Sequence, residues 1–294
     1  MNKVGFIGVG IMGKSMVRNL MKAGFELHIY ARTKSKVEDV IGEGAQFHES
    51  IKDCVQDCDA VITIVGFPQD VEEVYFDEGN ILDSAKEGAY LIDMTTTSPQ
   101  IAEKIYAEGT KRGFHVMDAP VTGGDTGAKA GTLSILVGGE KEDYEACMPL
   151  FEAMGTNINY QGKAGCGQHC KLANQIMIAG TLSGVCEALT YAKEQRLDPE
   201  VFMKSVATGA AGSKQLDTFG PKILKDDYAP GFFMKHFIKD MKLALIEANR
   251  KGLSLDVLSM VLANYEELEQ EGYGDLGTQA LMKFYDEEHR NTEE

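Results

Sequence analysis

The sequence predicts an α/β domain with a mainly parallel sheet, followed by an all-helical domain that a long helix joins to it. Up to about residue 160, short β-rich runs alternate with amphipathic helical segments, a pattern typical of βαβ units. Beyond residue 164, apolar residues recur at three- and four-residue spacing, and no convincing strand is found. The length of 294 residues also favours two hydrophobic cores over one. We therefore expect domains at 1–163 and 164–294.

The first domain should contain six strands, each a short run of β-branched, aromatic and other apolar residues. In chain order these are KVGFIG (3–8), ELHIY (26–30), DAVITIV (59–65), AYLIDM (89–94), FHVMDAP (114–120) and TLSILVGG (132–139). Helices are expected between and after them, at 12–23, 34–44, 69–76, 98–112 and 141–154. Since helices separate most of these strands, the sheet should be mainly parallel.

The second domain should be helical throughout. Apolar spacing predicts helices at 167–195, 198–208, 235–251, 254–271 and 275–287. The segment from Gly165 to Gln195 contains no proline. It can form one helix of roughly 30 residues, about 45 Å long, which suits the helix that joins the domains. The acidic tail at 286–294 should be solvated.

Charge and composition bound the possible partners and location. A formal net charge of −16 and a pI near 4.9 argue against nucleic acid or an anionic membrane as partner. No apolar run approaches the roughly 18 to 20 residues of a membrane span, and no signal-peptide h-region follows the first residues. Six cysteines in a chain this long indicate reduced thiols rather than a disulfide framework. We expect a cytoplasmic protein.

The run CGQHC gives only a weak hint of a metal site. Cys166, His169 and Cys170 are neighbours on one helical face, whereas zinc sites normally recruit ligands from more than one turn. We expect no metal.

A glycine fingerprint stands where the first strand gives way to a helix. It consists of Gly8, Gly10 and Gly13. In such a motif the first glycine permits a tight turn, the second lets a pyrophosphate approach the backbone, and the third allows close helix–strand packing. The fingerprint predicts a Rossmann dinucleotide-binding domain, with cofactor contacts from these glycines and from Ile11 and Met12.

The end of the second expected strand indicates which dinucleotide is bound. NAD-binding versions of this fold place an acid there to accept hydrogen bonds from the ribose 2′-hydroxyl. Here the strand ends in Ala31-Arg32-Thr33, and Glu26 lies at its opposite end. Arg32 can form a charge-assisted contact with a 2′-phosphate, Thr33 can donate a hydroxyl, and Lys36 adds positive potential. The sequence predicts NADP, with NAD possible.

Two further strand ends carry more hydroxyl and glycine residues than local structure requires. In DMTTTSP, Ser98 is enough to cap the following helix, so Thr95 and Thr96 are available for a ligand. In the next such segment, Thr122-Gly123-Gly124 offers a hydroxyl and two unobstructed backbone N–H groups, a receptor suited to a small carboxylate.

A polar group marks the start of the long helix. Lys171, Asn174 and Gln175 lie at positions i, i+3 and i+4, so they share a helix face, and mostly apolar residues surround them. We expect Lys171 to be partly buried with a depressed pKa. Such an amine can exchange a proton with an alkoxide near neutral pH.

At this point the chain resembles the β-hydroxyacid dehydrogenase family, which includes 3-hydroxyisobutyrate dehydrogenase, tartronate semialdehyde reductase and glyoxylate/succinic semialdehyde reductases. The resemblance covers nearly the whole chain. The blocks that carry it occur in the family's order: GFIGVGIMG, DMTTTSP, DAPVTGG…GAKAGTLSILVGG, GCGQHCKLANQ and FIKDMKLAL.

The resemblance implies an NAD(P)-dependent oxidoreductase that forms a homodimer or homotetramer and acts on a small carboxylate. It implies that Lys171 is the general acid/base, with Asn174 beside it. The substrate site should comprise Thr122, Gly123, Gly124, Thr95, Asn174 and Asp240. The cofactor should also contact Val65, Pro68, Thr95, Thr96 and Lys239. Thr122 replaces the usual serine and Thr95 a common one, which leaves the hydroxyl in place and the substrate fit open.

Two other interpretations are weighed against this one. A 6-phosphogluconate dehydrogenase shares the architecture but follows its lysine with His-Asn, whereas Lys171 here is followed by Leu172-Ala173-Asn174. A non-catalytic NADP-binding sensor could keep the glycines, but it would not need the lysine. The sequence does not distinguish glyoxylate, succinic semialdehyde, tartronate semialdehyde and hydroxyisobutyrate as substrates.

Overall fold

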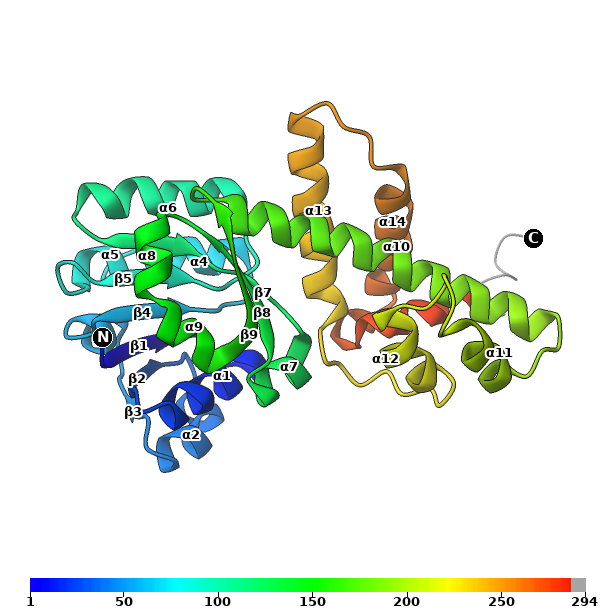
Figure 1. The fold of residues 1–294 in the computed structure, drawn as a ribbon, viewed down its shortest axis with the longest axis horizontal. Helices are drawn as coiled ribbons and strands as arrows, with labels where there is room; N and C mark the ends of the chain where they lie inside the picture. Colours follow the sequence, from blue (N-terminus) through cyan, green and yellow to red (C-terminus); the bar gives the residue numbers. More distant parts are fainter. Residues whose placement is uncertain (287–294) are drawn as a thin grey trace. The chain divides into compact units, whose positions relative to one another are not determined.

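The structure, a computed structural model, describes residues 1–286 and divides into two compact units (Figure 1). The first unit spans residues 1–171, and the second begins at Leu172. Helix α10 (Cys166–Glu194) runs from the first unit into the second. The predicted order of a parallel α/β domain, a long joining helix and a helical domain is confirmed.

The first unit is built on a nine-stranded sheet. Its strands are β1 (Lys3–Ile7), β2 (Glu26–Tyr30), β3 (Gln46–Phe47), β4 (Ala60–Thr63), β5 (Tyr90–Asp93), β6 (His115–Asp118), β7 (Val121–Thr122), β8 (Leu133–Gly138) and β9 (Gly155–Gly162). Strands β3-β2-β1-β4-β5-β6 are neighbours in that order and all parallel, the arrangement of a dinucleotide-binding sheet. Strand β8 runs antiparallel to β6 and pairs with β7 and β9.

Three of these strands were not predicted. Strands β3 and β7 have two residues each, too few to show an alternating pattern. Strand β9 reads GTNINYQG, and most of its residues are exposed or half-buried. It forms because it pairs in parallel with β8, a tertiary contact that overrides its weak intrinsic preference for a strand.

The helices of the first unit comprise the five predicted segments, two of them divided, and three short helices that were not predicted, at 51–55, 81–84 and 124–130. They are α1 (Ile11–Lys22), the short 3₁₀ helix η1 (Lys34–Lys36), α2 (Glu38–Gly42), α3 (Ile51–Val55), α4 (Pro68–Phe76), α5 (Ile81–Ser84), α6 (Pro99–Lys111), α7 (Gly124–Ala130), α8 (Lys141–Ala146) and α9 (Met148–Met154). The helix expected at 34–44 is interrupted at Val37, and that at 141–154 at Cys147. A proline in the first turn of α9 explains the second interruption, since proline favours a helix start.

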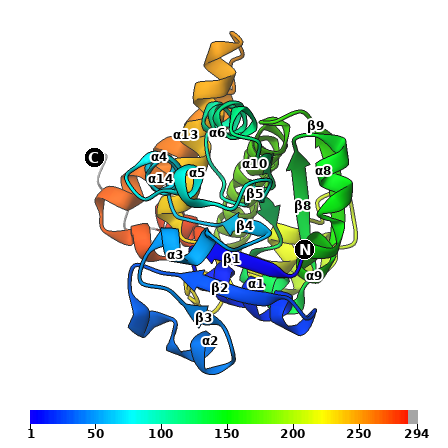
Figure 2. The ribbon, with the colours of Figure 1, turned by 90° about the vertical axis from the view of Figure 1, so that its left-hand side faces the viewer.

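Side chains alternate between two cores, one on each face of the sheet. Val4 and Phe6 of β1 enter the core formed with α1, α7 and α9, whereas Ile7 enters the core formed with α3, α4 and α5. Neighbouring strands divide in the same way: Ile62 lies on the first face and Val61 on the second. Figure 2 shows helices on both sides of this sheet. Burial on both faces explains why the strands read as continuous apolar runs.

The second unit packs α10 with further helices around its own core. These are α11 (Pro199–Val206), α12 (Lys214–Ile223), α13 (Met234–Arg250), α14 (Asp256–Gln270) and the 3₁₀ helices η2 (Tyr273–Asp275) and η3 (Thr278–Tyr285). Helix α12 was not predicted, and the helix expected at 275–287 is a 3₁₀ helix where described. Beyond residue 164, the described part contains no strand, only a single bridge between Phe233 and Gly277. The predicted solvated tail lies outside the described residues from 287 on.

Helix α10 corrects one expectation from the sequence. It has 29 residues, and its most apolar stretch has a mean hydropathy of 1.2, so it is long and apolar enough to cross a membrane, by length and composition only. About 44% of that stretch is buried within the protein. The expectation that no segment reaches membrane-spanning length was therefore wrong, and the helix is weak evidence for a membrane.

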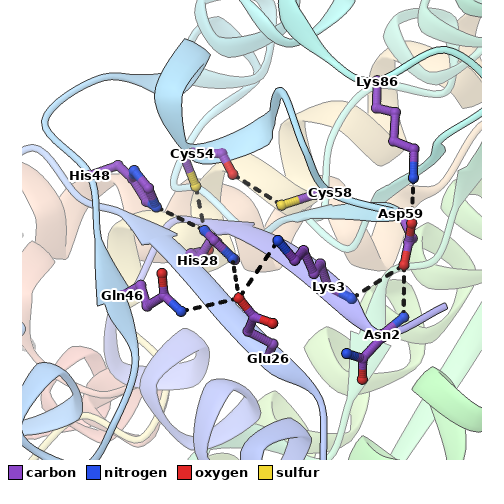
Figure 3. A network of polar contacts seen from close by, with 10 residues as sticks. All are labelled: Asn2, Lys3, Glu26, His28, Gln46, His48, Cys54, Cys58, Asp59 and Lys86. Carbon is purple, nitrogen blue, oxygen red and sulfur yellow. Dashed lines mark hydrogen bonds and ion pairs between the residues drawn. The ribbon is translucent and has the colours of Figure 1, made fainter.

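At the amino ends of the strands, a partly exposed polar network ties the chain together (Figure 3). The Asp59 carboxylate accepts the backbone N–H groups of Asn2 and Lys3, at 2.8 and 3.3 Å, and contacts Lys86 Nζ at 2.7 Å. Nearby, Glu26 contacts His28 Nε2 at 3.1 Å, and His28 Nδ1 lies 2.9 Å from His48 Nε2. Every carboxylate in this network therefore has a cationic, histidine or N–H neighbour.

Candidate cofactor and substrate site

The sheet order reverses between β1 and β4, and the glycine fingerprint lies in the loop that follows β1. Gly8 has φ +96°, and a Cβ there would lie 2.1 Å from the Ile64 carbonyl oxygen after β4. A Cβ on Gly13 would lie 2.2 Å from the Gly8 carbonyl oxygen. Packing therefore requires both glycines. A Cβ on Gly10 would meet no described atom within 4 Å, so the backbone there faces open space.

Helix α1 begins at this open space. Its N-cap is Gly10, which has no side chain that could accept hydrogen bonds from the helix N–H groups. The first turn of α1 contains no acidic residue. Ile11 is 47% exposed, and Met12 is half-buried. Uncapped N–H groups and the helix dipole together attract phosphate. The geometry fits the pyrophosphate of a dinucleotide held over Gly10.

Arg32 lies at the carboxyl end of β2, as predicted, but its guanidinium already has partners. Its Nη2 contacts Asp70 Oδ1 at 2.6 Å and Glu73 Oε2 at 2.9 Å, both on α4. Thr33 and Lys36 are exposed. Hydrogen bonding to Asp70 raises the pKa of Arg32, so the group stays charged. A 2′-phosphate would have to displace or share these carboxylates.

Helix α4, whose acids contact Arg32, begins at Pro68. Asp70 also accepts the backbone N–H of Phe67 at 2.9 Å, which fixes the first turn of this helix. Val65 is half-buried just before it. The predicted contacts Val65 and Pro68 therefore flank the start of a helix whose acids hold Arg32.

The loop after β5 buries one of the two predicted threonines. Thr95 is 1% exposed, and its Oγ1 accepts the Val65 N–H at 3.0 Å and donates to Asp93. Thr96, in contrast, is half-buried. The hydroxyl of Thr95 thus joins the loops after β4 and β5. Thr96 and the loop backbone are more accessible to a ligand than Thr95.

Asp93, at the end of β5, supports this loop from beneath. Its Oδ1 accepts the Thr63 hydroxyl at 2.8 Å and the Thr95 N–H at 3.1 Å. Its Oδ2 has no hydrogen-bond partner among residues 1–286. Burial raises the pKa of Asp93 to about 6, although hydrogen bonds from both threonines oppose the rise. This buried carboxylate orders the loop through its hydrogen bonds.

Asp118 holds the start of α10 in a similar way. It lies opposite Asp93 in the pairing of β5 with β6. Its two oxygens accept the backbone N–H groups of Gly165, at 2.7 Å, and Gln168, at 2.8 Å. A carboxylate from another element therefore caps the helix. Burial raises the pKa of Asp118, against the effect of these two hydrogen bonds.

The predicted carboxylate receptor follows β6. Thr122 ends β7 and is half-buried, whereas Gly123 and Gly124 are exposed, with φ of +131° and +62°. A Cβ on Gly123 would approach Leu133 Cδ2 to 3.3 Å, and one on Gly124 would meet no described atom within 4 Å. The positive φ values favour glycine at both positions. The turn exposes its backbone next to the Thr122 side chain.

Lys171 lies in the second turn of α10 and is 7% exposed. Gln168, one turn before it, is fully buried. These residues, with Gln175, form a buried polar stripe at positions i, i+3 and i+7 of one helix face. An amine this buried requires polar partners. The predicted burial of Lys171 agrees with its position.

The predicted residues of the second unit join one network. Asn174 Nδ2 donates to Gln175 Oε1 at 2.8 Å, and Gln175 Nε2 donates to Asp240 Oδ2 at 2.7 Å. Lys239 Nζ lies 3.0 Å from the other oxygen of Asp240, whose side chain is fully buried. Because the Asp240 carboxylate can only accept hydrogen bonds, Gln175 must direct its Nε2 toward it. The Oε1 of Gln175 then faces Asn174 and accepts from Asn174 Nδ2.

Sequence reasoning missed three buried polar residues that organise these segments: Asp93, Asp118 and Gln168. It placed Gln175 on the same helix face as Lys171 but gave it no role. Asp93 and Asp118 had a readable signal, because each ends an apolar strand where ligands of open sheets bind. Gln168 and Gln175 had only their helical spacing from Lys171. Among residues 1–286, no group of three or more His, Cys, Asp and Glu side chains could hold a metal ion.

The sheet order, the open glycine loop and the buried lysine define a nicotinamide-dinucleotide oxidoreductase of two units. Residues 3–162 match the family described as the NAD binding domain of 6-phosphogluconate dehydrogenase. Residues 165–285 match the one described as NAD-binding of NADP-dependent 3-hydroxyisobutyrate dehydrogenase. The chain belongs to the β-hydroxyacid dehydrogenase family and is an NAD(P)-dependent oxidoreductase.

Individual proteins agree with this assignment. The chain is 49% identical over 282 residues to the uncharacterized oxidoreductase YkwC of Bacillus subtilis (strain 168), covering 96% of this chain and 98% of that one. It is 44% identical to the probable 3-hydroxyisobutyrate dehydrogenase-like 1 of Arabidopsis thaliana, covering 95% and 84%. The solved 3-hydroxyisobutyrate dehydrogenase of Mycobacterium tuberculosis with L-serine superposes with a TM-score of 0.88 at 26% identity, covering 96% and 98%.

Proposed function

We propose that this enzyme interconverts a short-chain β-hydroxy acid and its aldehyde acid, with Lys171 as general acid/base. Substrates of the 3-hydroxyisobutyrate, tartronate semialdehyde, glyoxylate or succinic semialdehyde type fit this class. The observation that carries the proposal is the burial of Lys171, at 7% exposure, on a helix anchored to the ends of β5 and β6. A lysine on a rigid, water-poor support can deliver one proton to a fixed atom.

Each residue then has a distinct task. Thr122 with the N–H groups of Gly123 and Gly124 binds the substrate carboxylate, and Thr95 and Asp240 support the site through the hydrogen bonds described. Lys171 gives a proton to the carbonyl oxygen in reduction and takes it back in oxidation, and Asn174 orients the same oxygen. The bound nicotinamide supplies or accepts hydride at its C4 position.

The cofactor proposed is NADP, with NAD as a weaker alternative. Gly8, Gly10, Ile11, Met12 and Gly13 receive the pyrophosphate. The ribose end meets Arg32, Thr33 and Lys36, with no acid in the position that would accept a 2′-hydroxyl. Arg32 is oriented by Asp70 and Glu73, and a dianionic phosphate can share the guanidinium with these carboxylates or replace them. Thr96, Val65, Pro68 and Lys239 complete the proposed contacts.

The experiment compares Lys171→Ala with Lys193→Ala, an exposed lysine in the last turn of the same helix. The first substitution should lower kcat by roughly 10² to 10⁴ and leave the Kd for NADPH nearly unchanged, because it removes proton transfer alone. The second should leave both unchanged. Steady-state rates across a panel of short aldehyde acids identify the substrate. A Lys171→Ala enzyme that turns over at the wild-type rate contradicts the mechanism, and NADPH binding without turnover on any acid favours a sensor.

Cofactor preference has its own matched pair of variants. Arg32 and Arg18 each contact two acids, so Arg32→Ala and Arg18→Ala lose similar ion pairs. Only Arg32→Ala should reduce the ratio of kcat/KM for NADPH to that for NADH. A wild-type enzyme that prefers NADH, or an equal ratio in both variants, contradicts the assignment.

We also propose a homodimer or homotetramer in the cytoplasm. Large apolar side chains on α10 and α14 support self-association, since Met177 is 73% exposed, Val257 59% and Met260 51%. Light scattering on the purified protein measures the state, and a monomer at micromolar concentration contradicts it.

A further inference from the structure

Gln168 is a fully buried amide in the first turn of α10. Its side chain reaches the loop after β5 and makes two hydrogen bonds there. Oε1 accepts the Thr97 N–H at 3.0 Å, and Nε2 donates to the Thr95 carbonyl at 2.7 Å. One side chain therefore pairs with one backbone donor and one backbone acceptor of this loop.

The polarity of these contacts allows one orientation of the amide. A backbone N–H can only donate and a carbonyl can only accept, so Oε1 must face Thr97 and Nε2 must face Thr95. The two loop residues are two apart, the spacing at which one strand residue pairs with a neighbouring strand. Gln168 thus holds residues 95–97 as a further strand would. The loop cannot slide along the helix without breaking both bonds.

The backbone of the same residue is anchored to the neighbouring strand. Its N–H donates to Asp118 Oδ2 at 2.8 Å, while Gly165 N–H donates to the other oxygen at 2.7 Å. Asp118 ends β6, and the loop held by the side chain continues β5. Gln168 therefore fixes the start of α10 against two adjacent strand ends at once.

Lys171 follows on the same face, three residues later. Side chains on a helix lean toward its N-terminus, so the lysine stem lies over the turn that contains Gln168. We propose that Gln168 is a positioning residue that sets the distance between Lys171 and the loop carrying Thr95 and Thr96. This inference rests on the proposed function, because it assigns the amide a role only if Lys171 transfers the proton.

The second unit offers a matched buried glutamine without a proposed role. Gln279 is also fully buried, and its Nε2 donates to the carbonyls of Asp227 and Ala229, at 3.0 and 3.1 Å. It holds a loop as Gln168 does, but in a segment that carries none of the proposed site residues. Its replacement reports what losing such an amide does to stability alone.

The experiment uses the full-length enzyme with Gln168→Leu, Gln168→Glu, Gln279→Leu and Lys171→Ala. It measures the unfolding midpoint, NADPH stoichiometry and Kd, kcat, KM, and the isotope effect with 4-deuterated NADPH. Gln168→Leu should lower kcat per bound NADPH by about 10- to 100-fold, the cost of misplacing a reacting group by about an ångström. The isotope effect should rise as hydride transfer becomes slower, and the Kd for NADPH should stay within about threefold.

The control variants separate positioning from stability. Gln168→Glu keeps the acceptor for Thr97 and loses the donor for Thr95, so its kcat should lie between wild type and Gln168→Leu; it also covers the case in which the leucine variant does not fold. Gln279→Leu should lower the unfolding midpoint and leave kcat and the isotope effect unchanged. Wild-type kcat per bound NADPH in both Gln168 variants, or an equal loss in Gln279→Leu, overturns the inference. If Lys171→Ala alone loses activity, only the Gln168 inference fails; if it stays active, the acid/base role fails and the inference with it.

Discussion

The two ends of the same sheet hold their acidic residues in opposite ways. At the amino ends, Glu26 and Asp59 are partly exposed and surrounded by lysine, histidine and N–H groups, which lower the pKa of both (Figure 3). At the carboxyl ends, Asp93 and Asp118 are 2% and 3% exposed, and burial raises the pKa of both. The amino end gains stability from its charges, whereas the carboxyl end keeps charges that cost stability.

The difference teaches what the carboxyl-end acids are for. Burial disfavours the charged form of a carboxyl, so such a group is tolerated only where hydrogen bonds replace its hydration. Asp93 and Asp118 are retained where they order the loop of Thr95 and the start of α10. These segments carry the proposed site. At this end of the sheet burial disfavours the charge of the acids, but their hydrogen bonds hold the loops in one geometry.

The largest effect is expected from replacing Asp118, the acid that accepts two buried backbone N–H groups. Asp118 and Asp59 each accept two backbone N–H groups, but only the pair at Asp118 is buried. Asp118→Ala should lower the free energy of unfolding by roughly 2 to 5 kcal/mol, since each stranded buried donor costs about 1 to 3 kcal/mol. Asp59→Ala should cost about 1 kcal/mol, because water replaces its contacts. Denaturant titration measures both. An Asp118 variant less affected than the Asp59 variant would show that its charge, not its hydrogen bonds, dominates.

The carboxyl-end site was also the part that sequence reasoning described least well. The glycine fingerprint was readable because its glycine spacing is a local pattern, in which Gly13 packs against the Gly8 carbonyl. The mainly parallel sheet followed from alternating strands and helices. Which threonine is buried was not readable, because the bond from Val65 to Thr95 joins residues thirty positions apart. The same holds for Arg32, whose acids lie 38 and 41 residues further along the chain.

Buried amides were the other gap. A glutamine on a helix has the same local preference whether it faces water or a loop, so Gln168 and Gln175 carried no signal beyond their spacing from Lys171. The partners of Gln168, Thr95 and Thr97, are set by the tertiary fold. Strand β9 was not predicted for the same reason, because its pairing with β8, rather than its composition, makes it a strand.

A second, smaller effect sharpens the comparison through pH. Because Asp93 has a folded-state pKa of about 6 against an ordinary 3.8, the folded protein binds this proton more tightly than the unfolded chain. Stability should therefore fall as pH rises from about 4 to about 6, by roughly 2 to 3 kcal/mol, and stay low above that. Asp93→Asn keeps the acceptor for Thr63 and Thr95 and should remove this decrease.

Glu26 provides the control of opposite sign. Its pKa is lowered, mainly by the hydrogen bond with His28, so its stabilising contribution is present above the ordinary carboxyl pKa and is lost as pH falls. Glu26→Gln should therefore reduce the loss of stability as pH falls. Asp93→Asn should instead reduce the loss of stability as pH rises toward neutrality. Unfolding curves from pH 3.5 to 7.5 measure both. If the two variants changed the profile in the same direction, the contrast between the two ends would not hold.

The smallest expected effect concerns Lys86, which contacts Asp59 at 2.7 Å with its own side chain 52% exposed. Lys86→Met should lower the free energy of unfolding only slightly at low salt, because an exposed pair gains little in water. In about 1 M salt the loss should nearly vanish, since the screening length falls to about 3 Å. Lys104→Met is the matched control, as that lysine contacts Glu72 at 3.0 Å with equal exposure. Neither substitution should alter kcat or the Kd for NADPH. A change in kcat confined to Lys86→Met would mean that contacts at the amino end of the sheet affect the reaction. Ordering of the proposed site would then not be restricted to the buried acids at the carboxyl end.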